Sequence, residues 1–287
     1  MANYTSHAIM SELLFNKLKK KKKFKVDVNK DNMKLFSLGQ DLTFLNINCF
    51  HNTHSINSKR FFVDTIKYIK TNNLEYNEEV MAYLYGHIAH YALDINVHKF
   101  IKETIVDVDK VFFLKPHTIL ECNIDIYLVK KYDNNYNYLT IKNFNSNKVK
   151  EMINNTYTNV YGYFFTSKTY LKTIIFIKSI NGFVNTFYKS KKIFHLLTKK
   201  EKYINSYFYN CLNNNDLFNK KTDKLLNESI KKAELMIKYT NKYLYNKPKD
   251  LYLNLVFNNT PYNGKKISEN EFIFNKKLPL FNEIKIK

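Results

Sequence analysis

Glycine and proline are scarce in this sequence, which has 5 Gly and 4 Pro among 287 residues. Sandwiches and barrels need many tight turns, and those turns depend on these two residue types, so the composition argues against both folds. Neither a GxxxxGK[S/T] nor a GxGxxG motif is present, which excludes a nucleotide site built on a glycine loop. We therefore expect an all-α fold of long helices joined by polar loops.

Cysteine and long apolar runs are scarce too. Cys49, Cys122 and Cys211 are odd in number and widely spaced, so they predict neither a disulfide framework nor a CxxC metal knuckle. No apolar run approaches the roughly 18 residues of a membrane span. Residues 1–16 lack the basic and apolar regions of a signal peptide. We expect a reducing, cytoplasmic compartment and no transmembrane segment.

Arginine is almost absent, since Arg60 is the only one among 46 basic residues. With 25 acidic residues the net charge is +21, which suggests an anionic membrane surface or a nucleic acid as a partner. Lysine lacks the guanidinium fork that recognises phosphate specifically, and AT-rich codon usage also explains the composition. The run Lys19–Lys23 is either a polyanion-binding patch or a solvated helix end, and we favour the helix end.

Apolar residues recur at helical intervals along most of the chain. The predicted helices are 6–20, 57–69, 78–105, 117–131, 167–188, 191–212 and 222–244. Asn-rich stretches at 133–147 and 213–220 are interpreted as links between helices.

The histidines point to chemistry in the first half of the chain, which holds all but one of the 8. His90, Asp94 and His98 follow one another every four residues, so on a helix they lie along one face. Gly86, one turn before His90, is expected to leave space beside a ligand. His87 and His195 lie outside the pattern and are interpreted as structural.

A second stripe has the same step, because His117, Glu121 and Asp125 are also spaced four apart. Two helices that each present imidazole and carboxylate can face each other and enclose cations. The flanking residues are apolar in both stripes, and burying such polar groups costs free energy unless something satisfies them. A divalent metal does so, and mixed nitrogen and oxygen ligands suit zinc.

Further candidate ligands precede the two stripes: His7, Asp41 and the pair His51 and His54. Any single His–carboxylate pair is more often a surface ion pair than a ligand set, but the whole set favours metal binding. HExxH, adjacent His-Asp and ExxH are all absent, which argues against common metalloproteases, HD-type phosphohydrolases and di-iron bundles.

The order of these residues resembles the zinc-dependent phospholipase C family, in particular its intracellular bacterial branch, which is structurally related to the P1/S1 nucleases. A family block G-x-x-x-H-Y-x-x-D-x-x-x-H corresponds to Gly86, His90, Tyr91, Asp94 and His98. A later block H-x-x-x-E-x-x-x-D corresponds to His117, Glu121 and Asp125. Upstream features correspond to His7, to Leu38-Gly39-Gln40-Asp41 with Phe44, and to His54 ahead of Phe61 and Phe62. The resemblance covers about the first 130 residues.

The resemblance implies a compact all-α fold with two or three zinc ions in a cleft. One zinc would be bound by Asp41, His54, His90 and Asp94, and a second by His98, His117 and Glu121. Asp94 would bridge to a third, which His7 would help to bind. Asp41 would also take the proton from the attacking water, and Asp125 would hydrogen-bond a ligand histidine.

The chain departs from the family pattern at three points. Secreted members bind the third zinc with an N-terminal Trp, whereas this sequence contains 0 Trp. The Gly-Pro that usually precedes the aspartate is Gly39-Gln40 here. His51 is an alternative to His54 as a ligand, and we choose His54 for its distance from Phe61.

These features together predict a zinc-dependent phosphodiester hydrolase that resembles phospholipase C and acts on a phospholipid or another phosphodiester. Two alternatives are a P1/S1-like nuclease for single-stranded nucleic acid and a non-catalytic helical protein that the metal stabilises and that binds anionic membranes or polyanions. We expect one all-α metal-dependent hydrolase domain at 1–257, with the ligands in 1–131 and a helical remainder in 132–257. An irregular C-terminal segment is expected at 258–287.

Overall fold

The computed structural model is mostly helical over the part of the chain that it describes, and it has no strand there. That part comprises residues 4–43, 45–46, 50, 53, 58–105, 120–121, 124–125, 127–128, 131–132, 146–161, 169–170, 172–176 and 215–257. The prediction of an all-α fold is confirmed. Within these residues, no helix has both the length and the apolar character needed to span a membrane.

The helices are bounded as follows. They are α1 (Tyr4–Lys20), α2 (Lys30–Phe36), the 3-10 helix η1 (Gly39–Thr43), α4 (Ser58–Thr71), α5 (Glu78–Ile105), α7 (Asn147–Tyr161), α11 (Asn215–Tyr245) and α12 (Asp250–Val256).

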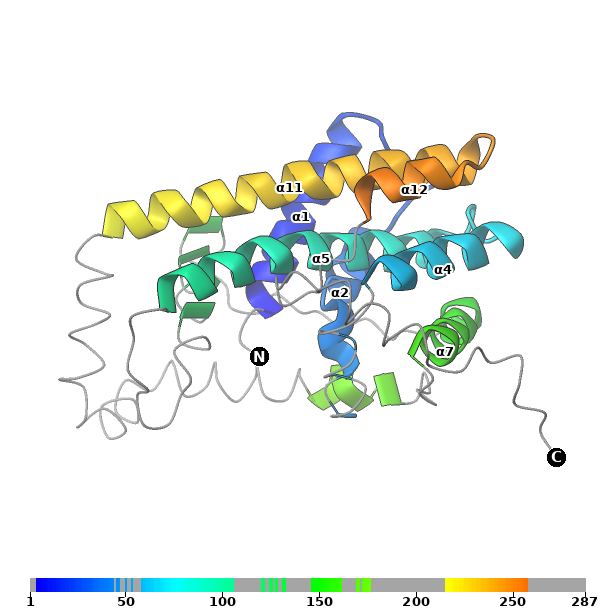
Figure 1. Cartoon of the computed structure of the whole chain (residues 1–287), viewed down its shortest axis with the longest axis horizontal. Helices are drawn as coiled ribbons and strands as arrows, with labels where there is room; N and C mark the ends of the chain where they lie inside the picture. The colour runs from blue at the N-terminus through cyan, green and yellow to red at the C-terminus, as the bar shows by residue number, and fades with distance from the viewer. Residues whose placement is uncertain are drawn as a thin grey trace, which may run out of the picture.

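Helix α5 is the centre of the fold. Figure 1 shows α11 running along it, α12 and α4 near one end, and α1 crossing both long helices. Contacts with α1, α2, η1, α4, α7 and α11 surround α5. The side chains of residues 80–95 are therefore buried on every face of this helix. A helix that is apolar all round is typical of a buried element, and here it carries His90 and Asp94 into the interior.

Gly86 allows α2 to pack directly on α5. A Cβ at this position would lie 2.7 Å from the backbone carbon of Phe36 and 2.8 Å from the backbone oxygen of Met33. The expectation that Gly86 leaves space beside a ligand is therefore wrong, because α2 fills that space. The close packing of α2 has a consequence for the site, since it places the chain that follows α2 against His90.

Three of the predicted long helices agree closely with the structure, namely α1, α4 and α5. The link predicted at 213–220 is wrong, because α11 begins at Asn215. Asn and Asp favour the start of a helix, and the buried residues that follow, such as Thr222, Leu226 and Ser229, keep helical spacing.

The other predicted helices are only partly covered. Parts of 117–131 and 167–188 are described and are helical there, while 191–212 and 258–287 lie outside the described residues. The sequence interpretation missed α2, η1, α7 and α12.

The lysine run lies at the exposed end of α1, which ends at Lys20. Lys17 and Lys21 reach Glu234 of α11, with Nζ to carboxylate oxygen distances of 2.9 Å and 2.5 Å. Lys19–Lys23 are exposed at the end of α1, beside α11, and the choice between a solvated helix end and a polyanion-binding patch stays a prediction.

Candidate metal centre

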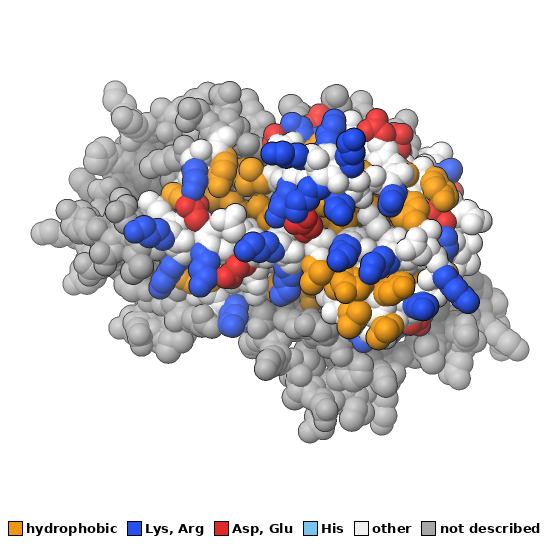
Figure 2. All heavy atoms as spheres, turned by 90° about the horizontal axis from the view of Figure 1, so that it is seen from above, with side chains coloured by type: hydrophobic (Ala, Val, Ile, Leu, Met, Phe, Trp, Pro, Cys, Tyr) orange, Lys and Arg blue, Asp and Glu red, His pale blue; other side chains and the backbone are white. Residues whose placement is uncertain are grey.

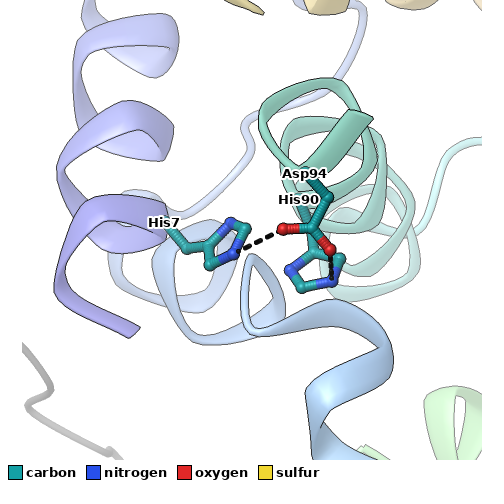
Figure 3. A group of neighbouring side chains, drawn as sticks. All are labelled: His7, His90 and Asp94. Carbon is teal, nitrogen blue, oxygen red and sulfur yellow. Dashed lines mark ion pairs between the residues drawn. The ribbon is translucent and has the colours of Figure 1, made fainter. Parts of the chain in front are cut away.

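Three buried side chains from two helices meet at one point. His7 comes from α1, and His90 and Asp94 come from α5; Figure 3 shows both imidazoles turned toward the carboxylate. The Nε2 atom of His7 lies 3.1 Å from Oδ1 of Asp94, and Nε2 of His90 lies 3.1 Å from Oδ2. One ligand atom from each residue lies within 4.8 Å of the other two. This group is small enough for a single ion to contact all three.

The helices account for this arrangement. His90 and Asp94 are one turn apart, so α5 presents them on the same face. Helix α1 packs on α5 and brings His7 to the same place, where its ring stacks on that of His90 with centroids 4.2 Å apart. Their exposed fractions are 1% for His7, 0% for His90 and 3% for Asp94. Burial of a carboxylate among imidazoles is costly without a compensating charge or hydrogen bonds.

A backbone carbonyl fixes the tautomer of His90. Its Nδ1 atom lies 3.0 Å from the carbonyl oxygen of Ser37, and a carbonyl can only accept, so Nδ1 donates. In the neutral ring Nε2 then carries a lone pair, and this atom faces Oδ2 of Asp94. Two acceptors at that distance repel unless a proton or a cation lies between them. Zinc-binding histidines commonly donate their other nitrogen to a carbonyl in this way, so these residues fit a metal.

Gly39 presses the chain against the same ring. Its φ is +52°, a conformation that favours glycine. A Cβ here would lie 2.3 Å from Cγ of His90. Any larger residue at this position would displace the imidazole.

The carboxylate of Asp94 carries a negative charge at neutral pH. Burial raises its pKa, but His90, His98 and His7 outweigh burial and hold the pKa well below its usual range. On the other side of the group, Nδ1 of His7 is buried and has no hydrogen-bond partner among the described residues.

A second pair of predicted ligands lies one turn further along α5. Nε2 of His98 is 3.2 Å from Oε1 of Glu121. Their side chains are 13% and 5% exposed. His98 also contributes to the low pKa of Asp94, so the pair is electrostatically linked to the first group. The structure thus brings two sets of predicted ligands to adjacent turns of one helix.

Asp125 holds the beginning of α1. Its Oδ1 atom accepts from the backbone N–H of Ser6 at 2.9 Å and from the hydroxyl of Ser6. The first N–H groups of a helix have no partner within it, and an oxygen acceptor there satisfies one of them. Burial, helped by the charge of Glu121, raises the pKa of Asp125 to about 8. Because His7 follows Ser6, Asp125 positions His7. Its predicted bond to a ligand histidine stays a prediction.

Asp41 lies in η1, the short helix that also contains Gly39. Its backbone N–H donates to the carbonyl of Leu38 at 3.0 Å, and the residue is partly exposed. Tyr157 of α7 fixes this helix, since its hydroxyl donates to Oε1 of Gln40 at 2.7 Å. Asp41 is therefore on a segment that is tied both to α7 and to His90.

The remaining predicted ligands cannot be placed. His51, His54 and His117 lie outside the described residues, as does Phe44. The predicted four-ligand set with Asp41 includes His54, and the three-ligand set with His98 includes His117, so the structure describes only part of each set. The assignment of residues to individual ions stays a prediction.

Sequence reasoning missed several residues that shape the site. The carbonyl of Ser37 left no signal in the sequence, because any residue type supplies a carbonyl. Ser6 was identifiable only as a possible helix cap.

His87 was interpreted as structural, and its Nδ1 atom lies 3.0 Å from the carbonyl oxygen of Tyr83. Burial lowers the pKa of His87 to about 3, so it is neutral.

The chain was compared with known proteins. A family model described as zinc dependent phospholipase C matches residues 6–171, more than half of the chain. The chain belongs to the zinc-dependent phospholipase C family. The predicted family resemblance is thus confirmed, although its intracellular bacterial branch is not established. No curated protein and no solved structure matches the chain. The match to the zinc-dependent phospholipase C model spans every predicted ligand and ends before α11.

Proposed function

We propose that this protein hydrolyses a phosphate diester with the help of zinc, most simply as a phospholipase C that acts on a phospholipid. One observation carries the proposal: inside the protein, Nε2 of His7 and Nε2 of His90 each lie 3.1 Å from a carboxylate oxygen of the same residue, Asp94. The tautomer of His90 is set by Ser37. A buried site of this kind, in a chain of a zinc-dependent family, is best satisfied by the metal.

The proposed ligands extend the described group. His7, His90 and Asp94 would hold one part of a centre with two or three zinc ions, together with Asp41 and His54. His98 and Glu121, with His117, would hold another part. When bound, zinc acidifies a water molecule to a pKa of about 7 and neutralises charge on phosphate oxygens.

We propose Asp41 as the group that accepts the proton of the attacking water. A general base must be reachable by water and held in place. Asp41 is partly exposed, whereas Asp94 is buried. The contacts of Gly39 with His90 and of Gln40 with Tyr157 fix the segment that carries it. Asp41 therefore combines access to water with a defined position.

Two other functions use the same residues. A nuclease for single-stranded nucleic acid is supported by the net charge of +21. A non-catalytic protein would keep the centre for stability: chelation of its zinc would unfold it, and it would hydrolyse no phosphodiester. We prefer the phospholipase because the chain belongs to the zinc-dependent phospholipase C family. The net positive charge does not favour one phosphodiester substrate over another.

The test compares zinc-loaded wild-type protein with the Asp41→Asn variant and a matched Asp64→Asn control. Asp64 is a carboxylate on α4 that pairs with Arg60 at 3.4 Å and does not belong to the predicted ligand set. We expect wild type and Asp64→Asn to release water-soluble phosphate ester from phospholipid micelles. Asp41→Asn is expected to retain zinc but lose at least about a hundredfold in rate.

The alternatives predict different results. Release of acid-soluble nucleotides from single-stranded DNA without phospholipid turnover selects the nuclease. Full zinc occupancy with no turnover of either substrate by wild type selects the non-catalytic protein.

A further inference from the structure

Three large apolar side chains are exposed on α11 and α12, outside the part of the chain that matches the family. Leu235 is 48% exposed, Leu251 61% and Leu255 58%. Leu251 and Leu255 are one turn apart on α12, so they point in the same direction. Exposed single leucines are common, but three on two adjacent helices form a surface feature.

The packing of the two helices brings these leucines together. The rings of Tyr239 and Tyr252 have centroids 6.2 Å apart, which pairs the two helices at this level. The link between them is short, so α12 turns back along α11 (Figure 1). Leu235 precedes Tyr239 by one turn, and Leu255 follows Tyr252 by about one turn. In an antiparallel pair these two leucines lie at the same level.

Lysines surround the leucines. The α11–α12 face, as we name it, consists of these leucines and the neighbouring lysines: Leu235, Leu251, Leu255, Lys231, Lys238, Lys242, Lys247 and Lys249. Figure 2 looks onto this side of the molecule and shows hydrophobic side chains gathered among Lys and Arg side chains. The end of α1 adds more lysines beside α11, because Lys17 and Lys21 contact Glu234.

The acidic residues near this face are paired with lysines. Glu234 contacts two of them, at 2.9 Å and 2.5 Å. Asp250, at the start of α12, lies 2.8 Å from Nζ of Lys67. These carboxylates therefore do not cancel the lysines of the face, whose net charge is positive.

The combination of charge and apolar side chains identifies the partner. A polyanion such as DNA binds lysines but gains nothing from exposed leucines. At a lipid bilayer the leucines enter the boundary between headgroups and acyl chains, while lysines attract anionic headgroups. On this face the Nζ of Lys242 lies 5.0 Å from the Tyr239 ring centroid, so a cation and an aromatic ring adjoin there. We propose that the α11–α12 face binds the surface of anionic phospholipid bilayers.

This binding goes beyond hydrolysis and does not require zinc. The test measures sedimentation of the full chain with vesicles of phosphatidylglycerol and phosphatidylcholine, and with vesicles of phosphatidylcholine alone. We expect the protein to bind the anionic vesicles, and binding to weaken as salt screens the lysines. Failure to bind the anionic vesicles at low salt overturns the proposal.

Paired variants separate the two contributions. The double variant Leu251→Ser/Leu255→Ser is expected to bind at least about tenfold more weakly. Its control is Ile175→Ser, which changes a side chain that is 64% exposed. That residue belongs to the stretch 172–176, light green at the bottom of Figure 1, on the side away from α11. The control is expected to bind as wild type does.

The charge variant is Lys231→Glu/Lys238→Glu, with the exposed Lys148→Glu on α7 as its control. We expect a loss of at least about tenfold in the first and a much smaller loss in the second. If only the lysine variant loses binding, and Leu251→Ser/Leu255→Ser binds the vesicles as tightly as wild type, the contact is purely electrostatic. The proposal is then overturned. Tight binding of single-stranded DNA in that case identifies a nucleic acid as the partner.

Vesicle binding and catalysis fail separately. The Asp41→Asn variant, proposed to be inactive, is expected to bind vesicles as wild type does. If Asp41→Asn loses turnover but still binds vesicles, the result bears only on the proposed function. If the leucine variant loses vesicle binding but still hydrolyses micellar or soluble substrate, the result supports the α11–α12 face.

Discussion

The Nδ1 atom of His90 lies 3.0 Å from the carbonyl oxygen of Ser37, and this contact turns the opposite nitrogen of the ring toward Asp94. The chain that supplies the carbonyl is positioned by α2, which packs on α5 where Gly86 has no side chain. Helix packing on one side of α5 therefore sets which ring nitrogen of a candidate ligand on the same helix donates to the backbone and which faces Asp94.

Gly39→Ala is expected to weaken zinc binding and to destabilise the protein by about 1 to 3 kcal/mol. The new Cβ would lie 2.3 Å from Cγ of His90, and alanine disfavours the φ of +52°. Zinc titration and thermal unfolding measure the two effects. Gly86→Ala serves as a comparison: it collides with Phe36 and Met33 of α2, so it is expected to destabilise the protein and to affect His90 only through α2. A Gly39→Ala protein with wild-type zinc affinity would show that η1 does not position His90.

Tyr157→Phe is expected to slow phosphodiester turnover while zinc content stays unchanged. The variant removes the hydroxyl that donates to Gln40 at 2.7 Å, next to Asp41, and costs about 1 to 2 kcal/mol of stability. Tyr85→Phe is a matched control, since it removes another buried hydroxyl, which donates to Asn241 at 2.6 Å. We predict that both variants lose a comparable amount of stability and that only Tyr157→Phe slows turnover. Equal turnover rates in the two variants would show that Tyr157 does not position Asp41.

The sequence anticipated the parts of the site that depend on spacing along one helix. His90, Asp94 and His98 share a face because they are four residues apart, and an uninterrupted helical pattern made α5 predictable. The position of His7 depends on how α1 crosses α5, and spacing within a helix carries no information about that crossing. The family resemblance supplied it instead.

The features that escaped prediction are contacts of the backbone and of short helices. A carbonyl such as that of Ser37 has no residue signature. Gly86 indicated a close approach, but the sequence did not say whether a ligand or another helix approaches. The helices α2 and α12 have 7 residues each, too few to show a helical period.

The ion pairs between α1 and α2 are expected to make stability depend on pH. Oε1 and Oε2 of Glu12 each lie 3.0 Å from Nζ of Lys30 and of Lys34, respectively. Burial raises the pKa of Glu12, but the two lysines outweigh it and lower the pKa below its ordinary value of 4.5. The stabilisation is therefore fully present above about pH 4.5 and is lost as the pH falls through the folded pKa.

Thermal unfolding of wild type and Glu12→Gln between pH 7 and pH 3 checks this expectation. The wild type is expected to be more stable by at most about 1 kcal/mol at pH 7, because both lysines are partly exposed. The difference should shrink below about pH 4. A difference that is constant over the whole range would mean that the charge of Glu12 is not involved.

Zinc content measured by elemental analysis, on protein purified without a metal-affinity tag, tests the central claim most directly. The account predicts two or three zinc ions per chain in wild type and in the Glu12→Gln control, and fewer in the near-isosteric Asp94→Asn and in His90→Ala. Wild-type protein that binds no zinc even when zinc is supplied, or an Asp94→Asn variant that keeps the full complement, would contradict it.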